Sequence, residues 1–512
     1  MATPLEELDL HWKEEDPTLG IMSEGMQCKD MNDIIERISK VKDTVKKISF
    51  KNQPVFTEVP DILKECANLE ELNFSHTKII SIPEYIFTLP NLRVLSCCCK
   101  GLPKAPTGLA KAQKLEKLHI RINENWNFPE DIASLSELKV LKLDIYSSAA
   151  FIKDLKKLTK LEELTLSIKY ESGAALNLPD SFMNHKALRK VGITDIVYKN
   201  YKILDFEKTM HILSSCPELQ SLTLFGLMIK KPDNLSKLTG LKVLELRHLK
   251  VEGKIFDSIK DLKKLEKLDV LGSEFGITEL PDIFGNYGEL RSFSFAGNFV
   301  RKLPPSLFLL NNLTTLEIGS TGISVIDDKV GNLKNLTGLQ IYDNMLEKLP
   351  NSIFTMPKLA VLNIEENFFK PQDIAAIKQK VGDLNKKGQK IEFICGNQGH
   401  RLTVKKLRAI SFLDSINSAV YYSYCMAAMC EKPSSIKYVR DDFLKDNEYI
   451  QVCIEAALRN IYPDFLIHVN HKRLKREDYE RICWVAILHL PSTISKMVDP
   501  TKELLALAGK RT

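Results

Sequence analysis

The sequence predicts an α/β fold: a solenoid of about fourteen repeated units with a curved parallel sheet, followed by a small all-α domain. A period of 23 residues predicts the solenoid, because Leu recurs at this spacing through Leu69, Leu92 and Leu115. A second period, of 30 residues, starts after the first one ends and aligns Leu444 with Leu474. The apolar residues in the segments that begin at Leu444 and Leu474 have helical spacing, which predicts a module of repeated helices.

Each 23-residue unit begins with the pattern LxxLxL, as in NLEELNF and KLEKLHI. In a short strand this spacing places the Leu side chains on one face, and neighbouring units bury them by stacking. Val45 is expected to open the frame. The frame then continues beyond Leu138 and Leu161 through units that start at Leu188, Leu219, Leu241, Leu265, Leu290, Leu313, Leu336 and Leu359.

These residues resemble the leucine-rich repeat family in its 23-residue form, LxxLxLxxNxLxxLPxxLxxLxx, over residues 45–396. The resemblance implies an Asn that binds the backbone of the turn, and Asn298, Asn344 and Asn367 stand at that place. Other units have a different residue there, such as Thr77, so their turns are expected to be looser.

A solenoid needs a cover at each end of its core. Residues 1–44 are predicted to form an N-terminal segment with a capping helix, because Ile34 and Ile38 have helical spacing after a possible N-cap at Asp30 or Asn32.

The carboxyl part of the chain is predicted to hold a second cover and a separate domain. The solenoid is assigned to residues 45–396, with a closing helix that begins near Pro371 and a final strand after it. Residues 402–512 are assigned to the helical-repeat module. This module resembles bacterial helical repeats of unknown function, which suggests a bacterial source.

Composition excludes several classes of protein. The 72 Lys+Arg nearly balance the 66 Asp+Glu, and a net charge of +6 on 512 residues gives no strong field, so neither nucleic acid nor a membrane is expected as a partner. The 11 Cys contain no CxxC spacing and fit reduced thiols. The first residues are acidic and lack an apolar stretch, so a cytoplasmic protein is expected.

Catalytic signatures are missing from the sequence. No phosphate-binding, dinucleotide-binding, zinc-protease or nucleophile-elbow motif occurs, so no catalytic residue, cofactor or metal site is predicted. Some bacterial leucine-rich repeat proteins are ubiquitin ligases with a catalytic Cys, which leaves an effector or enzyme activity in residues 402–512 as an alternative. Cys453 and Cys483 occupy equivalent positions of the 30-residue repeat, which favours packing. We expect alkylation at Cys98 or Cys28 before either of them.

The strongest predicted functional surface is the concave face of the sheet. Side chains between the Leu positions point to this face, and their charge changes from basic in early units to acidic in later ones. Such a surface orients another protein. The function predicted is therefore non-catalytic recognition or scaffolding. The alternative is that this face is polar only because it is exposed to water, as any exposed sheet face must be. The residues predicted to contact the partner are His119, Arg121, Lys142, Glu245, Arg247, Asp269, Glu317, Gln340 and Tyr342. The first three of them are expected to be solvated.

Overall fold

The chain forms two compact units, Met1–Leu262 and Lys263–Thr512, here called unit 1 and unit 2. The computed structural model describes residues 7–12, 26–51, 56–123, 126, 129–146, 155, 157–169, 178, 180–195, 202–203, 205–273, 279–297, 300, 302–321, 323, 325–344, 346–367 and 369–396. The predicted helical module of residues 402–512 lies outside these residues.

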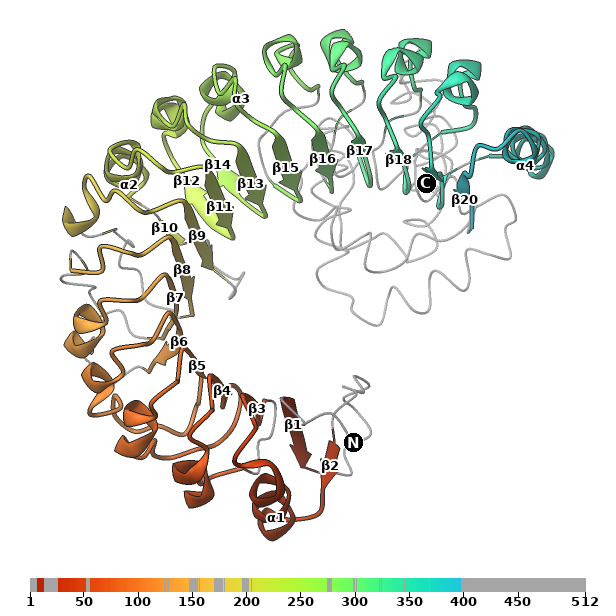
Figure 1. Ribbon diagram of the computed structural model, residues 1–512. Helices are drawn as coiled ribbons and strands as arrows, with labels where there is room; N and C mark the ends of the chain where they lie inside the picture. The colour runs from red at the N-terminus through yellow and green to blue at the C-terminus, as the bar shows by residue number, and fades with distance from the viewer. Residues whose placement is uncertain are drawn as a thin grey trace, which may run out of the picture. The chain divides into compact units, whose positions relative to one another are not determined.

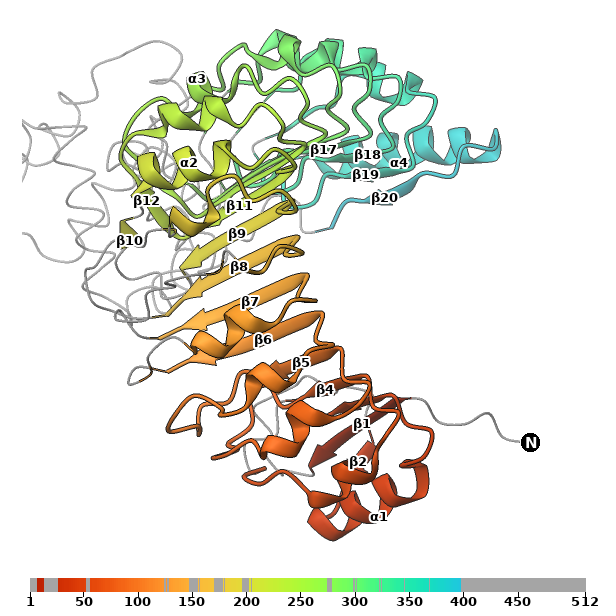
Figure 2. The same ribbon diagram turned by 60° about the vertical axis from the view of Figure 1, so that its left-hand side comes forward.

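Unit 1 contains a parallel sheet whose strands follow one another in chain order (Figures 1 and 2). From β3 to β9, and on to β11 and β13, each strand pairs with the next. The strands are β1 (Glu7–Trp12), β2 (Met26–Cys28), β3 (Lys47–Ser49), β4 (Glu71–Asn73), β5 (Val94–Cys97), β6 (Lys117–Ile122), β7 (Val140–Ile145), β8 (Glu163–Ile168), β9 (Lys190–Asp195), β11 (Ser221–Phe225) and β13 (Val243–Arg247).

The pairing register confirms the predicted Leu frame. Ile48 of β3 lies opposite Leu72 of β4, and Leu72 lies opposite Leu95 of β5. The sheet also extends beyond its predicted start, because β1 pairs with both β3 and β2. Leu5, Leu8 and Leu10, in and just before β1, have the LxxLxL pattern, but they do not stand 23 residues before Val45, so the 23-residue period did not reveal this strand.

Unit 2 contains parallel strands built on the same frame. Phe293, Leu316 and Leu339 lie opposite one another in consecutive strands and are buried. The strands are β15 (Lys267–Leu271), β16 (Ser292–Ala296), β17 (Thr315–Glu317), β18 (Gly338–Gln340), β19 (Val361–Asn363) and β20 (Glu392–Ile394).

Four α-helices occur in the described residues: α1 (Met31–Val41), α2 (Phe206–Ser214) and α3 (Ile255–Ile259) in unit 1, and α4 (Pro371–Lys386) in unit 2. Helix α1 begins after Asp30, whose side chain accepts a hydrogen bond from the backbone of Asp33, as expected of an N-cap. Ile34 and Ile38 form its buried face. Helix α4 starts at Pro371, a favoured first position because proline has no amide hydrogen to leave unpaired.

Short 3-10 segments connect the strands and lie on the side of each unit opposite its sheet (Figure 1). They are Asp61–Glu65, Glu84–Thr88, Leu109–Lys111, Glu130–Ser134, Asp180–Phe182 and Pro232–Lys237 in unit 1, and Phe284–Asn286, Pro305–Leu309, Asp328–Asn332 and Asn351–Thr355 in unit 2. Unit 1 also has a second, three-stranded sheet of β10 (Lys202–Ile203), β12 (Leu227–Ile229) and β14 (Lys250–Val251).

The core of each unit lies between its main sheet and the 3-10 segments. In β6, Leu118 and Ile120 are buried on this side, whereas His119 and Arg121 alternate with them and point to the other side. The side of the sheet away from the core is here called the inner face. The described residues therefore have the predicted α/β solenoid fold.

The turns after the strands differ in how well their backbone is held. Asn344 donates from its buried Nδ2 to the carbonyls of Ile318, Ile341 and Tyr342, at 2.6–3.2 Å. Thr77, at the same place in its unit, donates from its hydroxyl to one carbonyl, that of Phe74. An amide with two donor hydrogens satisfies more turn carbonyls than a hydroxyl with one.

Candidate functional site on the inner face of unit 1

Strands β6, β7 and β8 each have six residues, so each of them presents more than one inner-face position. The register places His119 opposite Lys142 and Arg121 opposite Asp144. These four residues form two neighbouring rows across β6 and β7. Three of the four were predicted as contact residues, and Asp144 was not.

Asp144 is the centre of the polar contacts on this face. Its Oδ1 lies 3.5 Å from Nε2 of His119, and its Oδ2 accepts a hydrogen bond of 2.6 Å from Nζ of Lys169. Burial raises the pKa of the Asp144 carboxyl, but the hydrogen bonds from His119 and Lys169 outweigh it and lower the pKa to about 2. The carboxylate is therefore charged at neutral pH although it is nearly buried.

Arg121 packs on an aromatic ring. Its guanidinium carbon lies 3.3 Å from the ring centroid of Tyr146, and its Nε donates to Oδ1 of Asn123. Nζ of Lys169 lies 5.3 Å from the same ring. Two cations thus share one aromatic side chain, an attraction that strengthens where water is partly excluded.

These contacts correct the expectation that the early basic residues are solvated. The side chain of His119 is 32% exposed, because it lies against Asp144. Arg121 is only partly exposed as well, since it stacks on Tyr146. Of the three residues, Lys142 is the most exposed, as expected of a solvated side chain. Its side chain is 46% exposed, and its Nζ lies 3.7 Å from a carboxylate oxygen of Glu163.

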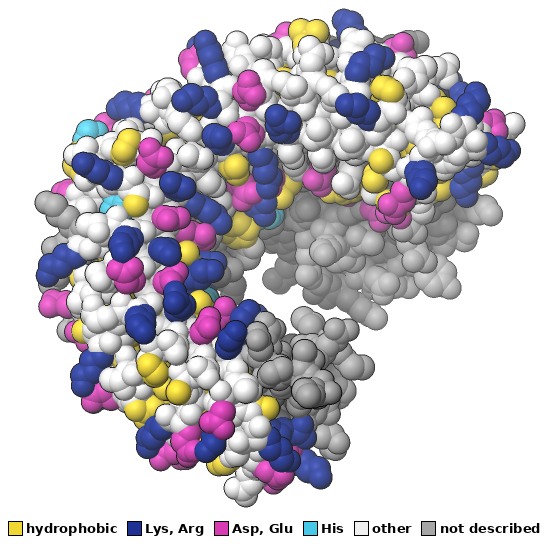
Figure 3. Space-filling view, viewed as in Figure 1, with side chains coloured by type: hydrophobic (Ala, Val, Ile, Leu, Met, Phe, Trp, Pro, Cys, Tyr) yellow, Lys and Arg dark blue, Asp and Glu magenta, His cyan; other side chains and the backbone are white. Residues whose placement is uncertain are grey.

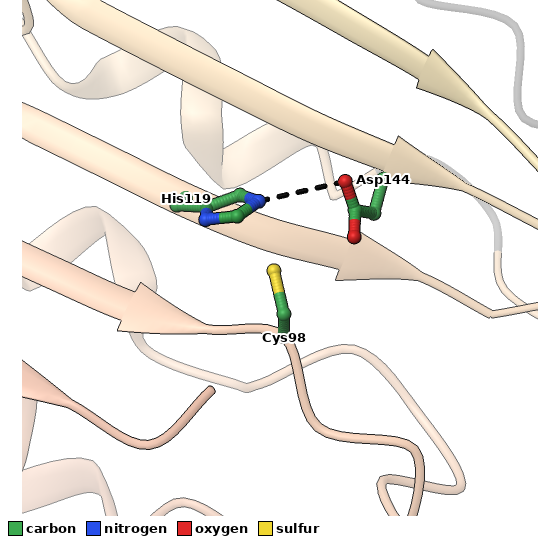
Figure 4. A group of neighbouring side chains, drawn as sticks. All are labelled: Cys98, His119 and Asp144. Carbon is green, nitrogen blue, oxygen red and sulfur yellow. Dashed lines mark hydrogen bonds and ion pairs between the residues drawn. The ribbon is translucent and has the colours of Figure 1, made fainter. Parts of the chain in front are cut away.

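Cys98 follows β5 and lies beside the same two residues. One possible ligand atom from each of Cys98, His119 and Asp144 lies within 4.8 Å of the others, and Figure 4 shows the thiol directed toward the imidazole and the carboxylate. Cys98 is only 2% exposed, and burial raises its pKa. Cys98 is therefore a poor target for alkylation, because its thiol is buried and little thiolate forms. Cys453 and Cys483, with which its labelling was to be compared, lie outside the described residues.

The predicted contact residues Glu245 and Arg247 lie together on β13. Nη2 of Arg247 lies 3.4 Å from Oε1 of Glu245, and Thr223 of β11 donates to Oε2 of Glu245 at 3.1 Å. The opposite charges of Glu245 and Arg247 therefore partly neutralise one another. A surface ion pair of this kind contributes little stability, about 0–1 kcal/mol.

Unit 2 brings three of its predicted residues together. Glu317 of β17 lies opposite Gln340 of β18, and its Oε1 accepts a hydrogen bond of 2.6 Å from the hydroxyl of Tyr342. Ser294 donates to the other oxygen of Glu317 at 2.8 Å. The remaining predicted residue, Asp269, is buried on β15, with Nζ of Lys267 at 4.0 Å from its Oδ2.

Four residues of the unit 1 cluster were missed by the sequence analysis: Cys98, Asp144, Tyr146 and Lys169. A signal for Asp144 was available, because it stands two positions after Lys142 and therefore on the same face of β7. Cys98, Tyr146 and Lys169 lie just beyond the ends of their strands, where alternation no longer predicts which way a side chain points.

On the side seen in Figure 3, the surface outside the inner face shows no large patch of one charge and no large hydrophobic patch. Lys and Arg are interspersed with Asp and Glu, and hydrophobic side chains are scattered (Figure 3). Several of these charges form ion pairs between neighbouring repeats, such as Lys139 with Glu116 and Lys160 with Glu137. Among the described helices, none has the length and apolar character needed to cross a membrane.

The stacked parallel strands, most of them followed in the described residues by a 3-10 segment or a short helix, define a repeat solenoid with a polar inner face. Two family models match it: a model described as a leucine-rich repeat region matches residues 59–224, and one described as a leucine rich repeat matches residues 311–369. The chain is a leucine-rich repeat protein.

Similar solved structures include a leucine-rich repeat protein of Leptospira interrogans, at 20% identity and a TM-score of 0.48, covering 70% of this chain and 97% of that chain. The plant peptide hormone receptor RGFR1 in complex with RGF2 has 17% identity and a TM-score of 0.38, covering 70% of this chain and 63% of that one. The TLR13–ssRNA13 complex has 18% identity and a TM-score of 0.45, covering 73% and 63%. No curated protein matches the chain significantly.

Proposed function

We propose that the protein recognises another protein without catalysis, and that the inner face of unit 1 contacts an acidic part of that partner. The observation that carries the proposal is the cluster around Asp144, in which His119 and Lys169 contact one buried carboxylate and Arg121, opposite Asp144 on the neighbouring strand, stacks on Tyr146. Side chains held in this way lose little freedom on binding, so a partner finds a preorganised surface.

The charges on this face favour an acidic partner. At the inner-face positions of β6 to β9, and at the residue directly after β8, the basic side chains include Arg121, Lys142, Lys169 and Lys190, and the carboxylates are Asp144 and Glu163. Because the cations at these positions outnumber the carboxylates, the net charge there is positive. Complementary charge accelerates association and selects the orientation of the partner.

The inner face of unit 2 is proposed as a separate contact of opposite charge. Glu317 is fixed by Tyr342 and Ser294, and Asp343 accepts a hydrogen bond of 2.7 Å from Ser320. These carboxylates would contact basic groups of a partner. A scaffold that joins two partners would use both surfaces.

We propose a cytoplasmic location and a bacterial source for the protein. The cysteine usage of the sequence supports a reducing, cytoplasmic setting, and the resemblance of residues 402–512 to bacterial helical repeats supports a bacterial source. Cys66, Cys97, Cys98, Cys99 and Cys216 are free thiols in the described part of the chain, which agrees with such a setting. The alternative of an activity in residues 402–512 concerns a part of the chain that the structure does not describe.

The test compares two charge-reversal variants of the full chain in affinity purification followed by mass spectrometry. Arg121→Glu with Lys142→Glu changes the inner face, and Lys114→Glu with Lys160→Glu makes the same change in charge away from it. The amount of partner captured should fall at least about tenfold with the inner-face variant and should not change with the control variant.

Two results would contradict the proposal. Equal capture by both variants would show that the inner face of unit 1 is not the contact. Capture that nuclease treatment abolishes would show that nucleic acid is the ligand, and a direct measurement with single-stranded RNA would then show affinity that falls steeply with salt.

A further inference from the structure

We propose that Cys98, His119 and Asp144 bind a zinc ion on the inner face of unit 1. The three side chains come from consecutive repeats: Cys98 follows β5, His119 lies on β6 and Asp144 on β7. Their ligand atoms lie within 4.8 Å of one another, and all three side chains point to one place (Figure 4). This site goes beyond partner recognition and does not depend on it.

The donor set selects the metal. A thiol sulfur, an imidazole nitrogen and a carboxylate oxygen are the three kinds of ligand that zinc accepts in proteins. Magnesium and calcium prefer oxygen ligands and would leave the sulfur and nitrogen of Cys98 and His119 unused. The cluster is therefore matched to zinc.

The distances require a small movement. Tetrahedral zinc with ligands at about 2.0–2.1 Å places nitrogen and oxygen about 3.3 Å apart. Nε2 of His119 and Oδ1 of Asp144 already lie 3.5 Å apart. A sulfur ligand at about 2.3 Å from zinc needs roughly 3.5 Å to each of the other ligand atoms. Because the ligand atoms lie within 4.8 Å of one another, Sγ of Cys98 has to approach by at most about 1.3 Å.

Lys169 holds the carboxylate in place for coordination. Its Nζ donates to Oδ2 of Asp144 at 2.6 Å and leaves Oδ1, on the side of His119, as the coordinating atom. Hydrogen bonds of this kind to a ligand's second atom orient metal ligands in proteins. The thiolate formed from Cys98 and the carboxylate of Asp144 together neutralise the dication, so the positive charge of Lys169 remains tolerable.

Zinc can enter from the solvent side. His119 is partly exposed, whereas Cys98 is at the bottom of the cluster. Three protein ligands leave a fourth tetrahedral position, which on this side is filled by water. The same three residue types could also form a thiol nucleophile, but a thiol that is 2% exposed cannot contact a substrate.

The experiment uses the full chain after treatment with a chelator and titrates it with Co²⁺ as the spectroscopic probe, followed by displacement with Zn²⁺. The wild type should show a charge-transfer band from thiolate to cobalt that saturates at one equivalent for this site and disappears when zinc is added. Cys98→Ser should remove that equivalent.

The neighbouring cysteines supply matched controls. Cys97→Ser and Cys99→Ser replace buried thiols that lie next to Cys98 in sequence, and both should keep the cobalt band. His119→Ala changes a partly exposed ligand, so it stays folded and should also lose the band. Lys169→Met should weaken zinc binding by roughly 10–100-fold without abolishing it.

Three outcomes would overturn the proposal: a wild-type chain with no cobalt band, a band that survives both Cys98→Ser and His119→Ala, or a band that Cys97→Ser or Cys99→Ser removes in a chain that still melts cooperatively. The first outcome would contradict metal binding at any thiol. The second and third would place the metal at a different thiol of the chain.

Discussion

Lys169 donates to Asp144 from the neighbouring repeat at 2.6 Å, and the carboxylate that receives this bond is almost buried. Lys169 follows β8, whereas Asp144 lies within β7, so the contact joins two adjacent repeats. Removing either partner would leave the other charge without its main compensation in a place that water hardly reaches.

The Asp144 pair predicts a specific loss of stability in acid. The folded-state pKa of about 2 lies below the ordinary value of 3.8, so the group contributes stability above about pH 4 and loses it as the pH falls toward 2. The shift corresponds to about 2 kcal/mol. Urea unfolding of the wild type and Asp144→Asn should therefore differ at pH 7 and converge near pH 2.

An exposed carboxylate provides the control for this prediction. Asp61→Asn changes a side chain that is 80% exposed and should alter the free energy of unfolding by less than about 0.5 kcal/mol. A wild type and an Asp144→Asn variant whose difference stays constant between pH 7 and pH 2 would show that the pair does not stabilise the fold.

The Leu frame predicts a local effect of a buried charge in unit 2. Leu316 on β17 is 1% exposed, so Leu316→Asp should cost roughly 4 kcal/mol or more. Hydrogen exchange should show the first loss of protection in β16, β17 and β18, because each repeat contacts its neighbours. Thr315→Asp, on the other face of the same strand, should leave protection nearly unchanged.

The side-chain amides of Asn344 and Asn335 should contribute differently to the free energy of unfolding, because Asn344 is buried and Asn335 is more exposed. Asn344→Ala leaves three turn carbonyls without their donor and is expected to cost about 2–3 kcal/mol. Asn335→Ala removes a donor to one exposed carbonyl, that of Asn311, and should cost about 1 kcal/mol or less. Thermal melting of the two variants, measured side by side, checks the order, and a larger effect at Asn335 would contradict it.

Thiol labelling should follow the exposure of the cysteines. Of the six cysteines whose burial the structure describes, Cys395 is partly exposed, whereas Cys66, Cys97, Cys98, Cys99 and Cys216 are buried. Alkylation of the native chain, read by peptide mass spectrometry, should therefore modify Cys395 well before Cys98. Faster labelling of Cys98 would mean that its thiol is accessible, and it would favour the nucleophile reading of the Cys98 cluster over metal binding.

The sequence predicts the solenoid because one physical requirement, the stacking of Leu side chains, repeats at a constant spacing. The constant spacing missed β1, because its LxxLxL pattern of Leu5, Leu8 and Leu10 does not stand 23 residues before Val45. It also cannot predict the cluster on unit 1. Asp144 contacts His119 and Lys169 diagonally across strands, and such contacts depend on rotamers and on the path of the chain after each strand.

The unequal length of the strands sets how much of a partner each unit can hold. At about 3.3 Å per residue, the six residues of β6, β7 and β8 span about 20 Å, whereas the three residues of β17, β18 and β19 span about 10 Å. An α-helix with its side chains is about 10–12 Å wide. The narrow strip of β17 to β19 therefore fits one helix or one extended segment, while β6 to β8 offer room for the face of a folded domain.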